Sequence, residues 1–383
     1  NNSNAETVLC QAMITRTVPN KVPVFSRVRK RDIESGGIMK TRIIALVIIA
    51  LGTFGASGAE GQALRDVFKR VNASVVVIRS VQSEVIAGSQ SQPVMAAGLG
   101  SGVLISKDGE IMTAAHLVDT ADTVSVEFSN GDIRVAKVIA SEPAADVALL
   151  KLNGPLPSGA AVAKLGDSDK AEVGDQIFVV GAPHGISYTL TVGYISGRRR
   201  PNTLYSGLSL TEFFQTDAAI NQGNSGGPMF NMVGEIIGIV SAIISKSGGS
   251  EGLGFAATSN MARRLLLEQR FFWGGVAGYF LMGKYAKMFN VPPPGAGMLI
   301  QYVAKDSPAA RVGLQGGTMR ATIEGENLVL GGDIVLAVEE IPFNIKNYEK
   351  IREILSRLDR EDTIRVKILR GGEQLELKAV TSP

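Results

Sequence analysis

The sequence contains almost no cysteine: Cys10 is the single one among 383 residues. An intramolecular disulfide is therefore excluded, and a stable structure must rest on hydrophobic cores. Histidine is nearly as scarce, because His116 and His184 are the two in the chain. Their side chains have an ordinary pKa near neutrality. A general base that works near pH 7 is therefore one of these two, or a lysine or carboxylate with a perturbed pKa.

A strong excess of one charge is also missing. The formal net charge is +3, and residues 1–59 hold 8 of the 39 Lys and Arg and 3 of the 36 acidic residues. Residues 60–383 thus carry 31 basic and 33 acidic groups, with no concentrated basic face, so nucleic-acid binding is not expected. Hydrophobic residues make up 45% and charged residues 20%, which indicates a globular chain, and its length suits two domains.

Long apolar runs are absent, and one short run lies near the N-terminus. Residues 43–54 are apolar, follow the basic residues 39–42 and precede small residues that end at Ala59. The run is too short to span a bilayer comfortably, and its order predicts a secretory signal peptide over residues 39–59, with cleavage after Ala59. The alternative is an uncleaved membrane anchor. Residues 1–38 precede a candidate start at Met39 and are expected to be a non-native leader without a fold.

The most informative stretch is Gly223-Asn224-Ser225-Gly226-Gly227-Pro228. A serine in a glycine-walled turn can present its hydroxyl outward while backbone N–H groups face an oxyanion. Upstream, one apolar run ends in His116 and another opens with Asp146. These residues supply nucleophile, base and orienting acid in the chain order His, Asp, Ser. Asp217 is an alternative orienting acid, whereas His184 is expected to be an ordinary surface or core residue.

The pattern of apolar residues favours β structure. A short amphipathic helix is predicted over residues 64–71, and after it short apolar segments alternate with Gly, Asp, Asn and Ser. Strands are predicted over residues 74–78, 102–105, 110–114, 123–128, 133–140, 147–152, 176–181, 190–196, 213–216, 229–230 and 235–241. Strands at this spacing, without long helices between them, predict antiparallel barrels. Loops are predicted over residues 197–210 and 245–254.

These motifs together resemble the trypsin-like serine proteases, and more closely the HtrA/Deg family. The resemblance covers about residues 60–380 and rests on residues 98–103, 113–116, 146–152 and 215–227. It implies a mainly β fold with two antiparallel chymotrypsin-like β-barrels, the active site in the cleft between them, and a PDZ domain. The implied segments are a protease domain over residues 60–262, a linker helix over 263–272 and a PDZ domain over 273–380. The implied protein is a periplasmic or secreted endopeptidase.

The resemblance and the motifs assign the same mechanism. Ser225 attacks a peptide carbonyl to form an acyl-enzyme, His116 transfers the proton, and Asp146 orients the imidazole. The backbone N–H groups of Gly223 and Ser225 form the oxyanion hole, and Asn224 shapes the turn. No metal or organic cofactor is expected, because the chemistry needs none and no metal-ligand spacing is visible.

Specificity is predicted from the strand after the serine. Ile239, Ser241 and Ala242 are expected to form a wall of the substrate pocket, or else to be ordinary barrel-core residues. Since no acid lies there to attract a basic side chain, we expect cleavage after small or medium aliphatic residues, best in unfolded proteins.

The sequence of the C-terminal part, residues 273–380, predicts a peptide-binding domain. The order of turns, strands and an amphipathic helix over residues 348–358 resembles a PDZ domain, which adds a peptide strand to a sheet edge beside a helix. The carboxylate-binding loop is expected at Trp273-Gly274-Gly275-Val276, with residues 278–281 as the second choice, and its ligands are hydrophobic C-terminal peptides. Residues 316–330 are longer than a typical connection at this point.

The resemblance further implies a homotrimer assembled near the N-terminal segment around Phe68. It also lets the arginines at 198–200 meet an acidic partner, although such a run is commonly a solvated loop. Membrane association is expected if the signal segment stays uncleaved. Another class of function is a non-enzymatic chaperone or peptide-binding scaffold with a protease-like fold. An esterase is a weaker alternative, because Ser225 is not in a Gly-x-Ser-x-Gly elbow that leads into a helix.

Overall fold

A computed structural model describes residues 63–84, 94–182, 188–199, 212–243, 249–270, 272–357 and 362–380. Contacts divide the chain into two units, Asn1–Ala59 and Glu60–Pro383. Because the described ranges begin at residue 63, the expected leader and signal segment lie outside them. Within the described ranges, no helix has the length and apolar character needed to cross a membrane.

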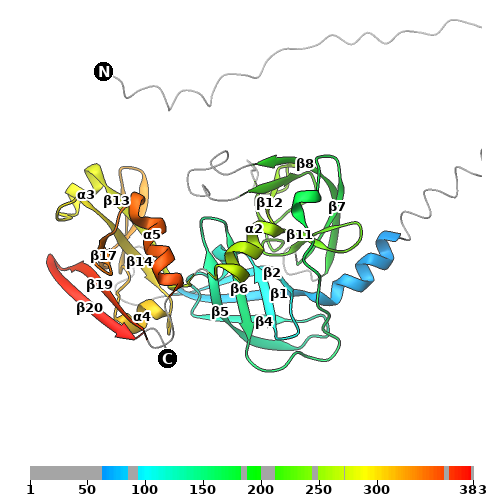
Figure 1. The fold of residues 1–383 in the computed structure, drawn as a ribbon, viewed down its shortest axis with the longest axis horizontal. Coiled ribbons are helices and arrows are strands. Elements are labelled where there is room, and N and C mark those ends of the chain that lie inside the picture. The colour runs from blue at the N-terminus through cyan, green and yellow to red at the C-terminus, as the bar shows by residue number, and fades with distance from the viewer. Residues whose placement is uncertain are drawn as a thin grey trace, which may run out of the picture. The chain divides into compact units, whose positions relative to one another are not determined.

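The first barrel follows a helix over residues 63–71 (Figure 1). Its six strands pair antiparallel and close in the order β1-β2-β3-β6-β5-β4. They are β1 (Val75–Glu84), β2 (Val94–Leu104), β3 (Glu110–Thr113), β4 (Thr123–Glu127), β5 (Ile133–Glu142) and β6 (Val147–Leu152). The period of two along β5 buries Ala136 and Val138 and exposes Ile133 and Val135, as expected for a strand with one face on a core.

The second barrel repeats this design. Its strands close in the order β10-β11-β12-β9-β8-β7. They are β7 (Gln176–Gly181), β8 (Thr189–Arg199), β9 (Phe213–Thr216), β10 (Pro228–Asn231), β11 (Ile236–Ile243) and β12 (Gly254–Thr258). Phe178 and Phe230 stack at 5.2 Å on the face of this barrel that meets the first barrel. One core cluster continues from these rings to Val103 and Leu149 of the first barrel, so the two barrels are packed on a shared apolar interface. The predicted pair of barrels is confirmed.

A short helical segment leaves the second barrel. α2 (Ser259–Arg263) continues as a π-helical turn over Arg264–Glu268. The helix therefore begins and ends earlier than the predicted linker helix over residues 263–272. Leu265 and Leu266 are buried in the core shared by the barrels. This burial ties the helix to the protease-like part of the chain.

The C-terminal part forms a sheet in the order β13-β14-β17-β19-β20, with β18 paired to β17, and this sheet is consistent with the predicted PDZ domain. Its strands and helices are β13 (Val276–Met282), α3 (Gly283–Met288), β14 (Ala296–Val303), α4 (Pro308–Val312), β17 (Ile334–Val338), β18 (Ile341–Pro342), α5 (Ile345–Ser356), β19 (Thr363–Arg370) and β20 (Glu373–Val380). α5 starts before the predicted residue 348 because the Asn344 side chain accepts a hydrogen bond from the N–H of Asn347 and caps the helix. The long segment 316–330 contains a separate hairpin, β15 (Met319–Ile323) and β16 (Glu326–Leu330).

Candidate active site

The predicted nucleophile lies on a tight turn between β9 and β10. Gly223 and Gly226, on either side of Ser225, have φ of 102° and 79°, which favours glycine. Gly226 is also packed too tightly for any side chain. A Cβ there would lie 2.3 Å from both the carbonyl oxygen of Ser101 and Oγ1 of Thr113. The glycines of the motif are thus required by the backbone conformation and by close packing.

The structure brings the predicted base and acid together. His116 lies in a 3₁₀ turn, Ala115–Leu117, directly after β3, and Asp146 directly precedes β6. Nδ1 of His116 is 2.9 Å from each carboxylate oxygen of Asp146, and the backbone N–H of His116 donates to Oδ1 at 3.0 Å. Asp146 has φ of 51°, a conformation found preferentially in Asp and Asn among residues with a side chain. Two strand ends and one left-handed residue therefore fix the pair.

The surroundings of His116 shift its pKa. Burial by itself lowers the pKa of the imidazole, but the hydrogen bond and the charge of Asp146 outweigh it and raise the pKa above its ordinary value. The imidazole is still 49% exposed, whereas the carboxylate of Asp146 is 10% exposed. The ring can therefore meet a substrate from solvent while its partner stays shielded.

Ser241 connects the acid to the serine. Its hydroxyl makes a short hydrogen bond to Oδ2 of Asp146, and its carbonyl oxygen accepts a hydrogen bond from Oγ of Ser225 at 3.2 Å. Within the described ranges, the Ser225 hydroxyl has no hydrogen bond to His116. The serine is thus placed beside the His–Asp pair, with its hydroxyl turned to the Ser241 carbonyl.

Two backbone donors near the serine are unused. As far as the structure describes the chain, the N–H groups of Gly223 and Ser225 have no hydrogen-bond partner. Asn224 between them is 1% exposed, and its N–H and carbonyl oxygen bond to Asn221 and Gly227 within the turn. Unpaired backbone donors in a buried turn are what an oxyanion site requires.

The other predicted site residues lie as follows. Ile239 is fully buried in the core shared by the barrels, and Ser241 contacts Asp146 and Ser225 as described above. The side chain of Ala242 and the whole of His184 fall outside the described residues. Asp217 is exposed and accepts a hydrogen bond from the N–H of Tyr194 at 2.7 Å, so it serves the backbone of β8 and not His116.

Asp119 lies near the His–Asp pair and has a perturbed pKa, which the sequence did not predict. It follows His116 by three positions and accepts a hydrogen bond from the hydroxyl of Ser141 at 2.9 Å. Burial raises the pKa of Asp119 to about 6; the Ser141 hydrogen bond opposes this shift and the charge of Asp146 adds to it. No pattern in the sequence distinguishes Asp119 from a surface acid, because Ser141 lies on a different strand.

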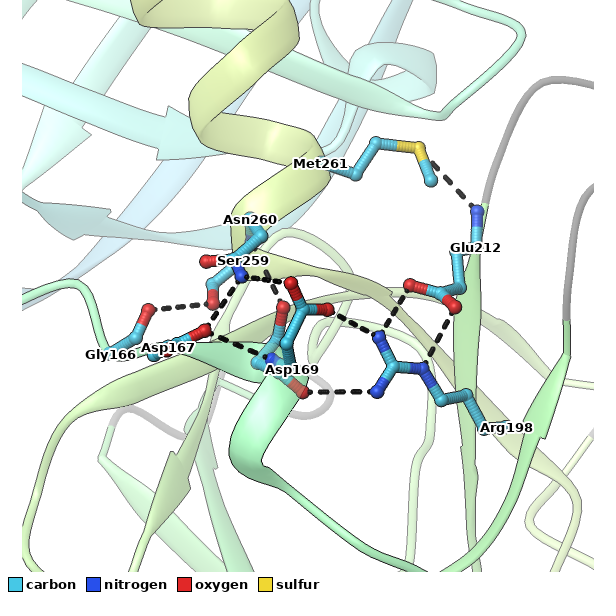
Figure 2. Close-up of polar contacts among 9 residues, drawn as sticks. Gly166, Asp167, Asp169, Arg198, Glu212, Ser259, Asn260 and Met261 are labelled. Atoms are coloured by element: carbon cyan, nitrogen blue, oxygen red, sulfur yellow. Dashed lines mark hydrogen bonds and ion pairs between the residues drawn. The ribbon is translucent and has the colours of Figure 1, made fainter.

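Arg198 lies in a strand and not in the predicted loop over residues 197–210, because β8 extends to Arg199. Figure 2 shows its guanidinium between two acids: it binds both carboxylate oxygens of Glu212 at 2.8 Å and one of Asp169 at 2.7 Å. Asn260 of α2 donates to the same Asp169 at 3.0 Å. The acidic partners of Arg198 are therefore in its own chain, and through Asp169 they link the end of β8 to α2.

The predicted carboxylate-binding loop lines a cavity of about 370 Å³ between β13, α5 and the first barrel, whose residues Asp119, Ser141, Glu142 and Pro143 also line it. Residues 273–276 line it, and so do Gly278 and Phe280 from the second-choice segment, with Tyr348 of α5 opposite. Trp273 donates from its indole N–H to the carbonyl oxygen of Asp119 at 2.8 Å. Both predicted segments thus belong to one apolar groove at the edge of a sheet.

Comparison with known proteins finds similarity to serine proteases. A family model described as "Trypsin-like peptidase domain" matches residues 100–239. The chain is 38% identical over 268 residues to a probable periplasmic serine endoprotease, DegP-like, of Pseudomonas fulva (strain 12-X), covering 67% of this chain and 54% of that protein. It is 40% identical over 248 residues to the protein of the same name from Pseudomonas putida (strain W619), covering 62% and 50%.

The chain thus spans about half the length of the curated relatives it matches. A solved structure described as "HtrA-type protease AlgW with decapeptide" is 27% identical, covers 83% of this chain and 97% of that chain, and has a TM-score of 0.48.

Proposed function

Because this chain belongs to the HtrA/Deg family of trypsin-like serine proteases, we propose that it is a periplasmic serine endopeptidase that degrades unfolded or damaged proteins. The names of its relatives support the activity and the compartment. The segments we propose are a protease domain over residues 60–262 and a PDZ domain over 273–380, with 39–59 as a signal peptide. Residues 263–272 join the two domains, and Leu265 and Leu266 within them pack on the protease core.

The proposed reaction uses His116, Asp146 and Ser225. His116 accepts the proton of Ser225 as the hydroxyl oxygen attacks the peptide carbonyl, and the electron pair of the C=O bond moves to oxygen. His116 then gives the proton to the leaving amine, which leaves an acyl-enzyme that water hydrolyses. Asp146 holds the Nδ1–H tautomer and stabilises the imidazolium. The N–H groups of Gly223 and Ser225 bind the oxyanion, with Asn224 shaping their turn.

One observation carries this proposal: a single residue, Ser241, hydrogen bonds to Asp146 through its hydroxyl and to Ser225 through its carbonyl. The nucleophile and the orienting acid, which are far apart in the chain, are therefore held two hydrogen bonds apart. For the proposed reaction to begin, the Ser225 hydroxyl must leave this carbonyl and donate its hydrogen bond to His116 instead.

The proposed substrates are unfolded proteins, cleaved after small or medium aliphatic residues. Ala242 remains a candidate for the pocket wall and Ser241 contributes there through its backbone, whereas Ile239 lies in the core shared by the barrels. A peptide library in which cleavage after Lys or Arg dominates would contradict this specificity.

The proposed role of the C-terminal domain is to bind hydrophobic C-terminal peptides. The apolar groove beside residues 273–276 supports this role, because a peptide strand added to β13 would face the aromatic rings of Phe280 and Tyr348. We also propose a homotrimer assembled through the segment around Phe68, whose ring packs partly buried on the shared core.

The test compares the wild-type protein with Ser225→Ala on unfolded casein at neutral pH, with and without a hydrophobic C-terminal peptide. Cleavage by the wild type alone is the expected result. If neither protein cleaves in either condition but both prevent aggregation of the casein, the chain is a chaperone or a scaffold. Equal cleavage by both proteins would refute Ser225 as the nucleophile.

A further inference from the structure

Ser101 belongs to the first barrel, but its polar atoms reach the turn of Ser225 in the second. It lies in β2 and is 0% exposed. Its N–H donates to the carbonyl oxygen of Ser225 at 2.8 Å, and its hydroxyl donates to the carbonyl oxygen of Gly223 at 2.7 Å. The same hydroxyl accepts from the N–H of Ala182 at 3.0 Å, and the Ser101 carbonyl accepts from Thr113 Oγ1 at 2.7 Å. Every polar group of Ser101 is therefore engaged.

These bonds restrain the two unpaired donors of the serine turn. The N–H of Ser225 lies in the chain between two carbonyls that Ser101 holds, those of Gly223 and Ser225. The N–H of Gly223 belongs to the residue whose carbonyl the Ser101 hydroxyl binds. A peptide unit is planar, so these bonds hold the units 223–224 and 225–226. The unit between them carries the N–H of Ser225, and the N–H of Gly223 lies in the unit directly before them. Ser101 thus fixes the backbone from which both proposed oxyanion donors project.

Three glycines pack closely around Ser101. A Cβ added at Gly181 would lie 3.1 Å from Oγ of Ser101, and one at Gly227 would lie 3.2 Å from its Cβ. A Cβ at Gly226 would lie 2.3 Å from its carbonyl oxygen. Three glycines therefore let the backbone approach Ser101 from separate sides, one at its hydroxyl, one at its Cβ and one at its carbonyl oxygen.

We infer that Ser101 is a positioning residue for the proposed proteolysis: its hydroxyl holds the Gly223 carbonyl so that the N–H groups of Gly223 and Ser225 face the developing oxyanion. This inference rests on the proposed function. Ser101 touches no substrate and transfers no proton. It acts through the turn, from the opposite barrel, and therefore makes catalysis depend on how the two barrels are packed.

The test is Ser101→Ala beside Ser74→Ala in the full chain. Ser74 is a matched control, because it is also 0% exposed and its hydroxyl also donates to a backbone carbonyl, that of Val71, at 2.6 Å. With an internally quenched peptide, kcat of Ser101→Ala should fall about 10- to 100-fold with KM within about twofold, since a small misplacement of catalytic groups costs up to about 10²-fold. Ser74→Ala should keep both constants.

A second readout separates positioning from loss of fold. A peptide aldehyde adds reversibly to the serine: the Oγ–C bond forms, the C=O pair becomes an oxyanion and the proton passes to His116. Its affinity should fall in Ser101→Ala by the same factor as kcat, and should not change in Ser74→Ala. Ser101→Cys, which keeps a weak donor, should lose less than Ser101→Ala, and it serves as the test if the alanine variant does not fold.

The outcomes are distinct. A folded Ser101→Ala with kcat and aldehyde affinity within twofold of the wild type would overturn the inference and leave the proteolysis intact. An equal loss in Ser101→Cys and Ser101→Ala would also overturn it, because the donor would then not matter. Failure of the proposed function has another signature, which is that Ser225→Ala cleaves as well as the wild type.

Discussion

The partly buried carboxyl group of Asp119 gives a prediction that can be worked out in magnitude. Burial raises its pKa from the usual 3.8 to about 6. Because the pKa is higher in the folded chain than in the unfolded one, the folded state holds this proton more tightly. The stability that this proton supplies is therefore present at low pH and is lost as the pH rises toward about 6. At about 1.4 kcal/mol per pKa unit, the ionised carboxylate costs up to about 3 kcal/mol at neutral pH.

Asp119→Asn removes the charge and keeps an oxygen that accepts the hydrogen bond from Ser141. The new amide N–H₂ group needs a partner, which offsets about 1–2 kcal/mol of the gain. We expect the variant to be about 1–2 kcal/mol more stable than the wild type at pH 7.5, and not more stable at pH 4.5. The assay is urea unfolding followed by the fluorescence of Trp273, the single tryptophan of the chain, whose indole bonds to Asp119.

Asp122→Asn is the matched control. Its carboxylate accepts hydrogen bonds from the N–H and hydroxyl of Ser83, at 2.9 and 2.6 Å, and from the N–H of Lys305 at 2.8 Å. Removing that charge should lower stability at pH 7.5. The reasoning would be refuted if Asp119→Asn were less stable than the wild type at pH 7.5, or if its gain were the same at both pH values.

Three further predictions concern catalysis and the ion pairs of Arg198. The pKa of His116 is raised above its ordinary value, and the imidazole must be neutral to act as a base. In a pH–rate profile, kcat/KM should therefore fall toward low pH with a midpoint above about 6.5. A lower midpoint would contradict this. Asp146→Asn should lower kcat by about 10⁴-fold with the fold unchanged, measured on a peptide substrate, because the imidazole adopts the wrong tautomer. Arg198→Met should cost about 2 kcal/mol, since it leaves Glu212 without its charged partner, and Tm measured by calorimetry should fall; an unchanged Tm would show that the cluster contributes no net stability.

The parts of the site that the sequence predicted are the parts encoded locally. His116, Asp146 and Ser225 each lie in a short motif with its own pattern of neighbours, and the structure brings the first two into direct contact. The barrels were predictable for the same reason, since each strand carries its own apolar alternation and each turn its own Gly, Asp or Asn.

The parts that the sequence did not predict depend on contacts between distant segments. Ser241 and Asp146 are 95 positions apart, and Ser101 and Gly223 are 122 apart, so neither hydroxyl could be assigned its partner. Arg198 was assigned to a loop because an arginine run has a loop-like composition. Its place in β8 depends on pairing with Phe214 and on the charge of Glu212, neither of which lies in the local pattern.

The most direct test of the account is covalent labelling of the serine. The wild-type protein is incubated with a fluorophosphonate probe, digested and mapped by mass spectrometry, beside His116→Ala and Ser225→Ala. The account predicts one adduct in the wild type, on Ser225, with labelling slowed in His116→Ala and abolished in Ser225→Ala. An adduct on another residue, or equal labelling of Ser225→Ala, would contradict it.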